Sequence, residues 1–172
     1  MCITIELKIL KTLIKMMLNI DQQEELMRLA MDEAAKAVEE GNYPFGAVIV
    51  DEDGNVVGSA HNTQETDSDP TAHAEINLIR QLAKSCDEQA FGQFTLISNA
   101  ESCSMCFSAA IKTGIRQYVF GAPSEPHMDP YLTVETVARH SHNALEITYG
   151  VLESECVQQI AQTRKSQGKL AQ

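Results

Sequence analysis

Two short motifs in the middle of this chain constrain its fold more than any other feature. His73-Ala74-Glu75 comes first, and Cys103-Ser104-Met105-Cys106 follows after an interval of 27 residues. The first motif offers an imidazole nitrogen and the second offers two sulfurs, a donor set that Zn²⁺ prefers in a tetrahedral site. The fold must therefore bring these two segments together if His73, Cys103 and Cys106 bind one ion.

The residues before each motif predict that both motifs lie at the start of a helix. Asp69 and Pro70 precede His73, a pair typical of an N-cap followed by the first helical position. Ser102 is the corresponding candidate cap before Cys103. Residues three apart share one helix face, so both sulfurs can reach one metal. A helix N-terminus also lowers the pKa of a thiol, which favours the thiolate that binds metals.

Glu75 is the candidate catalytic residue. The sequence shows no obvious fourth ligand, so we expect water to complete the metal site, as hydrolytic catalysis requires. Two thiolates reduce the acidity that zinc confers on this water, and a neighbouring base is then needed. Alternatives remain at this point: Glu75 as an exposed acid stabilised by the helix dipole, the Cys103 and Cys106 pair as a thioredoxin-like redox centre, or a closed structural zinc site.

At these residues the chain resembles the zinc-dependent cytidine-deaminase-like family, which pairs a His-x-Glu motif with Pro-Cys-x-x-Cys. The resemblance covers about residues 22–165. Residues 44–50 are similar to the family's first strand, and residues 69–75 are similar to its guanine deaminase and tRNA adenosine deaminase branches. This chain has Ser102 where relatives usually have Pro. The resemblance implies that zinc binding survives this change, because that Pro is not a ligand.

The same resemblance implies a set of substrate contacts beside the metal. Asn62 occupies the position of a base-contacting Asn in relatives, and its amide can both donate and accept hydrogen bonds. Its alternative role is turn chemistry after a strand. Phe45 could stack on a flat ring, and it could equally be a core residue. Ala74 completes the predicted set.

Alternating strand and helix patterns predict an α/β fold with three layers, in which helices cover both faces of a mixed five-stranded sheet. Residues 21–168 are predicted to form one deaminase domain, and residues 1–20 an extension outside its core. The predicted strands are residues 45–51, 55–61, 93–98, 117–120 and 144–149. The predicted helices are residues 21–40, the segment from Pro70 to about Ala83, Cys103 to about Lys112, residues 131–139 and residues 152–165.

The charge of the chain bears on its partners. The net charge is −11, and residues 1–20 contribute +2, so the remainder carries −13. Nucleic-acid binding needs clustered Lys and Arg, so this acidity disfavours a nucleic-acid partner. Five Cys with one close pair predict a reducing, cytoplasmic location with a metal site. No stretch approaches 18 uncharged apolar residues, so we expect no transmembrane helix.

Together these features predict a zinc-dependent hydrolytic deaminase that releases ammonia from a nucleobase or nucleoside. Guanine or a related purine is favoured by the acidity and by the Pro44-Phe45-Gly46 segment. A tRNA-specific adenosine deaminase is the first alternative, because residues 150–156 are similar to that branch. Cytosine or cytidine deaminase and a non-catalytic zinc module are further alternatives. One Zn²⁺ per chain and a homodimer are what the resemblance implies.

Overall fold

The structure, a computed structural model, describes residues 18–124 and 131–166 and is built around a five-stranded sheet in the order β2-β1-β3-β4-β5. Its strands are β1 (Gly46–Val50), β2 (Val56–His61), β3 (Thr95–Ala100), β4 (Gln117–Ala122) and β5 (Glu146–Thr148). Strand β1 runs antiparallel to β2 and β3, whereas β3, β4 and β5 run parallel to one another. The predicted mixed sheet is therefore confirmed.

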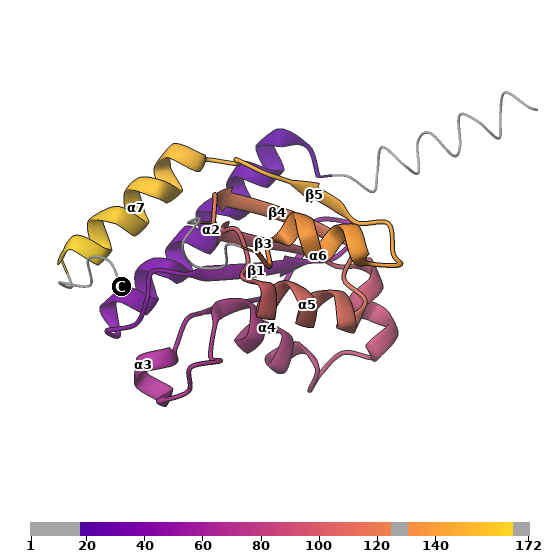
Figure 1. Cartoon of the computed structure of the whole chain (residues 1–172), viewed down its shortest axis with the longest axis horizontal. Helices are drawn as coiled ribbons and strands as arrows, with labels where there is room; N and C mark the ends of the chain where they lie inside the picture. Colours follow the sequence, from indigo (N-terminus) through magenta and orange to yellow (C-terminus); the bar gives the residue numbers. More distant parts are fainter. Residues whose placement is uncertain (1–17, 125–130, 167–172) are drawn as a thin grey trace, which may run out of the picture.

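Helices cover both faces of this sheet (Figure 1). On one face lie α2 (Ile20–Glu39) and α7 (Glu153–Ser166), and on the other lie α4 (Ala74–Leu82), α5 (Ser104–Thr113) and α6 (Val134–His140). Two short elements were not predicted, α3 (Gln64–Asp67) and a 3-10 helix (Glu88–Gln93). The predicted three-layer α/β fold is confirmed. Among the described residues, no helix is both long and apolar enough to span a bilayer.

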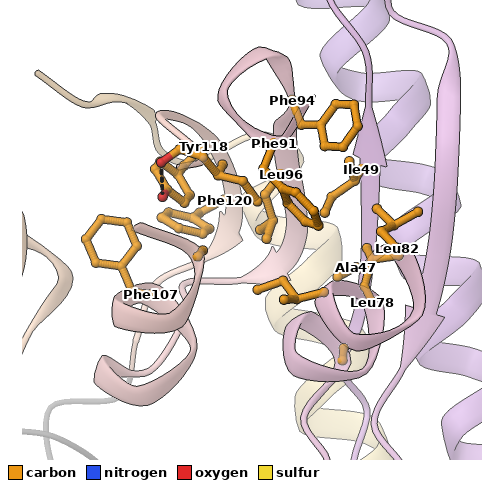
Figure 2. Packing of buried hydrophobic residues seen from close by; sticks show 14 of the residues in the cluster. Ala47, Ile49, Leu78, Leu82, Phe91, Phe94, Leu96, Phe107, Tyr118 and Phe120 are labelled. Carbon is orange, nitrogen blue, oxygen red and sulfur yellow. Dashed lines mark hydrogen bonds between the residues drawn. The ribbon is translucent and has the colours of Figure 1, made fainter. Parts of the chain in front are cut away.

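The sheet separates two apolar clusters. Ala47 and Ile49 of β1 face the cluster under α4 and α5, whereas Val48 and Val50 face the cluster under α2 and α7. All four are fully buried, and a strand buried on both faces is continuously apolar for this reason. In the first cluster the ring of Phe107 packs against Tyr118, whose hydroxyl donates to a main-chain carbonyl at 2.7 Å (Figure 2).

Helix α2 crosses β1 so closely that position 46 admits only glycine. A Cβ on Gly46 would lie 2.1 Å from the carbonyl oxygen of Ala30 and 2.5 Å from the nitrogen of Ala34. Alanines on this face of α2 allow the approach, since they have the smallest side chains with a Cβ. This contact fixes where the chain enters β1 after Phe45, relative to the main chain of α2.

Some predicted boundaries were wrong for local reasons. The strand expected at residues 93–98 is Thr95–Ala100, because the 3-10 helix extends to Gln93. The helix expected from residue 131 begins at Val134, because the Thr133 side chain caps it. Residues 1–17, most of the predicted extension, lie outside the described residues, and its last residue, Ile20, is the first residue of α2.

Candidate metal and catalytic site

The two motifs meet where the N-terminal ends of α4 and α5 lie on one face of the sheet (Figure 1). His73 is the N-cap of α4 and Cys103 is the N-cap of α5, and both have extended backbone conformations. Neither side chain caps its own helix. Cys106, in the first turn of α5, is buried. The imidazole and the two sulfurs are therefore available to one another.

Both predicted helix starts were wrong. Asp69 does not cap α4, because its carboxylate accepts hydrogen bonds from the main-chain nitrogen and hydroxyl of Thr71, at 2.8 and 2.7 Å. This local turn is a common use of Asp, and it delays the helix until Ala74. Ser102 likewise lies one residue before the true N-cap of α5. The ligands His73 and Cys103 consequently sit just before their helices rather than inside the first turn.

The three candidate ligands have the geometry of a zinc site. Their ligand atoms all lie within 4.8 Å of one another, and Cys103 Sγ is 3.6 Å from His73 Nδ1. Tetrahedral zinc, with Zn–S near 2.3 Å and Zn–N near 2.0 Å, separates these atoms by about 3.5 Å. Among the described residues, no other His, Cys, Asp or Glu joins this group. Three protein ligands are typical of a catalytic zinc site rather than a closed structural one.

The protonation of the ligand group also favours a cation. A hydrogen bond from Cys106 lowers the pKa of Cys103 to about 4, and the same contact raises the pKa of the Cys106 thiol. The Cys103 sulfur in turn raises the pKa of His73. Two sulfurs this close cannot both ionise without a cation nearby, because their charges repel. A divalent ion removes this conflict.

Glu75 lies beside the ligands, as the sequence predicted. It is the second residue of α4, and only 6% of it is exposed. Its Oε1 accepts a hydrogen bond of 2.7 Å from the Ser102 hydroxyl. It also contributes to the raised pKa of the Cys106 thiol. The alternative of an exposed first-turn acid is therefore wrong, whereas the hydrogen bond from Ser102 was not predicted.

Asn62 follows β2 and is fully buried. Its Oδ1 accepts from the Gln64 nitrogen at 3.1 Å, and its Nδ2 donates to Gln64 Oε1 at 2.7 Å. Gln64 then donates to the carbonyl of Pro70 at 3.0 Å, in the loop that leads to His73. The turn chemistry considered for Asn62 is thus present, and its contact with substrate stays a prediction. The orienting role of Gln64 was missed, because a Gln two residues after an Asn has no specific sequence signature.

Phe45 and Ala74, the other predicted substrate contacts, are both packed. Phe45 is half-buried against both apolar clusters, and Ala74 is fully buried in the cluster under α4 and α5. Asn99 holds the bend on either side of Phe45, because it accepts from the Gly46 nitrogen and donates to the Pro44 carbonyl, each at 3.0 Å. Sequence reasoning missed Asn99, although a polar residue near the end of an apolar strand was a signal.

The remaining Cys and His residues within the described part of the chain lie apart from the metal group. Cys86 and Cys156 are free thiols outside it. The Nδ1 of His61 lies 3.0 Å from Glu33 Oε2, and its Nε2 lies 3.1 Å from Glu40 Oε2. Cys2 and His127 are outside the described residues.

A family model describes the same residues. The zinc-binding region of cytidine and deoxycytidylate deaminases matches residues 20–122, which include the three candidate ligands and Glu75. This chain belongs to that family. As a member it is a zinc-binding deaminase, a hydrolase that acts on C–N bonds. His73, Cys103 and Cys106 are the candidate ligands of its zinc.

Three relatives of this deaminase are informative. The tRNA-specific adenosine deaminase of Haemophilus influenzae is 36% identical over 157 residues, which are 86% of this chain and 87% of that protein. A solved structure of a tRNA:A34 deaminase, which edits A to I at the wobble position of transfer RNA, is 31% identical with a TM-score of 0.66. The matched region covers 78% of this chain and 98% of the chain in that structure. The guanine deaminase of Nitrosomonas europaea has a TM-score of 0.70 at 21% identity, covers 83% and 84% of the two chains, and supports the fold alone.

Proposed function

We propose that this deaminase acts hydrolytically on a purine ring and that its substrate is an adenosine of transfer RNA. The observation that carries the hydrolytic mechanism is the convergence of His73, Cys103 and Cys106 beside the buried carboxylate of Glu75. The observation that supports the substrate is the similarity to tRNA-specific adenosine deaminases over almost their whole length.

The chemistry follows from the position of Glu75. Zinc held by His73, Cys103 and Cys106 would lower the pKa of a water molecule, and Glu75 would act as the base that completes its activation. Glu75 accepts the proton that this water loses as its oxygen bonds to the amino-bearing ring carbon. The carboxyl group gives this proton to the ring nitrogen. It then takes the second proton from the hydroxyl group now on the ring carbon and gives it to the departing amine. The C–N bond breaks, ammonia leaves, and the ring keeps a carbonyl.

The choice of a tRNA substrate reverses the preference for guanine that the sequence alone favoured. The whole-length match with the Haemophilus influenzae protein is 36% identical. The Nitrosomonas europaea guanine deaminase is 21% identical. Because a pocket is built from side chains, the higher identity supports a shared substrate class more strongly than a shared fold does.

The surface charges favour a second candidate, a free purine such as guanine. Four cations in the described part of the chain are already paired with acids: Arg28 with Glu24, Lys36 with Glu33, Arg80 with Asp69 and Arg139 with Glu135. A cation held by an acid on its own surface is less available to a phosphate of a nucleic acid. A small neutral ring requires no such contact.

One assay separates the candidates. Ammonia release is measured with guanine, guanosine, cytosine, cytidine, adenosine and an anticodon stem-loop that carries adenosine at the wobble position, and zinc is measured in the same preparation. We expect release from the stem-loop, with inosine as the product. Release from guanine alone would establish the second candidate. A zinc-loaded protein that releases ammonia from none of them would be a non-catalytic module.

We propose a homodimer in the cytoplasm as the working form of the enzyme, since the resemblance implies a dimer and the reduced thiols suit that compartment. Light scattering of the full chain at several concentrations tests the first part. A mass of one chain, 18.9 kDa, throughout that range would exclude the dimer.

A further inference from the structure

The hydroxyl of Ser102 connects the two motifs of the site. Ser102 lies in the short connection between β3 and α5, whereas Glu75 lies in the first turn of α4. Their side chains meet at 2.7 Å, with Ser102 Oγ as donor and Glu75 Oε1 as acceptor. Only 5% of Ser102 and 6% of Glu75 are exposed. Water therefore competes weakly for this hydrogen bond.

Helix capping does not explain this serine. The N-cap of α5 is Cys103, one residue further along the chain. A Ser hydroxyl near a helix start usually bonds to main-chain nitrogens of that helix, but this hydroxyl bonds to a carboxylate that belongs to another helix. A hydrogen bond to a charged acceptor is also stronger than one to a neutral group. The contact therefore orders Glu75 rather than α5.

We propose that Ser102 is a positioning residue for the Glu75 carboxylate. This inference rests on the proposed role of Glu75 as the proton carrier. Glu has three side-chain torsions, and an unanchored carboxylate would sample several orientations beside the ligands. Ser102 holds Oε1, so the second oxygen has a defined direction from which to exchange protons with the reacting groups. Misplacement of a catalytic group by about 1 Å can lower a rate about a hundredfold.

The first experiment compares steady-state kinetics of three variants on the substrate that the wild type deaminates. Ser102→Ala removes the donor, Ser102→Thr keeps a hydroxyl, and Ser108→Ala is the matched control at an exposed position of α5. We expect Ser102→Ala to keep its zinc and its KM while kcat falls about ten- to a hundredfold. Ser102→Thr should restore most of the loss, and Ser108→Ala should match the wild type. Zinc-loaded Ser102→Ala with kcat within twofold of the wild type would overturn the proposal.

The second experiment reads the contact without activity. Melting temperatures of Ser102→Ala, Glu75→Ala and the double variant form a cycle, measured on the zinc-free proteins. We expect Ser102→Ala to lower the melting temperature of the wild type by more than it lowers that of Glu75→Ala, because the acceptor is then already absent. Equal decreases would show that the two side chains do not interact and would overturn the proposal.

The two experiments separate this proposal from the proposed function. A wild type that deaminates no compound contradicts the proposed function, although the cycle still measures the contact between Ser102 and Glu75. An active wild type with an unaffected Ser102→Ala contradicts only the positioning role. If Ser102→Ala does not fold, the test rests on Ser102→Thr, which keeps the hydroxyl donor. A zinc-loaded Ser102→Thr protein whose kcat is lost relative to the wild type would contradict the proposal.

Discussion

Cys103 Sγ lies 3.6 Å from His73 Nδ1 although the two residues are 30 positions apart in the chain. Each is the N-cap of its own helix, and each leaves its side chain out of the capping interaction. Helices α4 and α5 pack on the same apolar cluster at one face of the sheet, and this packing brings the two ligands together.

Removal of one sulfur should empty the zinc site. Cys106→Ala leaves two protein ligands, which is below the number typical of protein zinc sites. We expect the zinc content to fall from one per chain to roughly a tenth or less, measured by elemental analysis after dialysis against a weak chelator. Cys86→Ala is the matched control, because Cys86 lies outside the ligand group. Full zinc in Cys106→Ala would contradict the ligand assignment.

Zinc retention should depend on pH through His73. The Cys103 sulfur raises the pKa of His73 above its ordinary value of 6.5 in the metal-free protein. The metal requires the neutral imidazole, so protons compete with zinc below this raised pKa. The affinity for zinc should therefore start to fall at a higher pH than an ordinary His would give, and should keep falling as the pH is lowered.

A chelator competition series between about pH 5 and pH 8 measures this dependence. A Cys86→Ala protein, which keeps all three ligands, is the control and should follow the wild-type curve. If zinc affinity stays constant throughout the series, His73 is not a ligand.

Glu75→Gln should separate metal binding from catalysis. The amide keeps the size of the side chain and can still accept from Ser102, but it cannot carry a proton. We expect full zinc and a kcat lower by about a hundred- to ten-thousandfold, measured by ammonia release. Turnover within tenfold of the wild type would rule out Glu75 as the proton carrier.

Gly46→Ala should destabilise the fold without touching the ligands. The added Cβ would lie 2.1 Å from a main-chain oxygen of α2, and main chain yields less easily than a side chain. We expect the free energy of unfolding to fall by about 1–3 kcal/mol, measured by urea denaturation. Gly92→Ala is the control, because its nearest neighbour lies at 3.9 Å. Equal stabilities of the two variants would show that α2 moves away from β1 freely.

Local sequence patterns predicted most of the fold and the metal ligands. Helix α2 was expected at residues 21–40 and is Ile20–Glu39, and the strand expected at residues 55–61 is Val56–His61. Such elements follow from apolar periodicity, which acts between close neighbours in the chain. The boundaries that failed, such as the start of α4, depend on competition between hydrogen bonds, here between a helix cap and the Asp69 turn.

What the sequence alone determined about this protein is its chemistry: one imidazole, two thiols and a carboxylate at spacings that suit a zinc-dependent hydrolase. Only the tertiary structure decided which side chains orient that chemistry, because Ser102 meets Glu75 and Asn99 holds the bend at Phe45 through contacts between distant segments. A donor and its acceptor in different elements leave no periodic signal, since their meeting depends on how the elements pack rather than on the residues beside them.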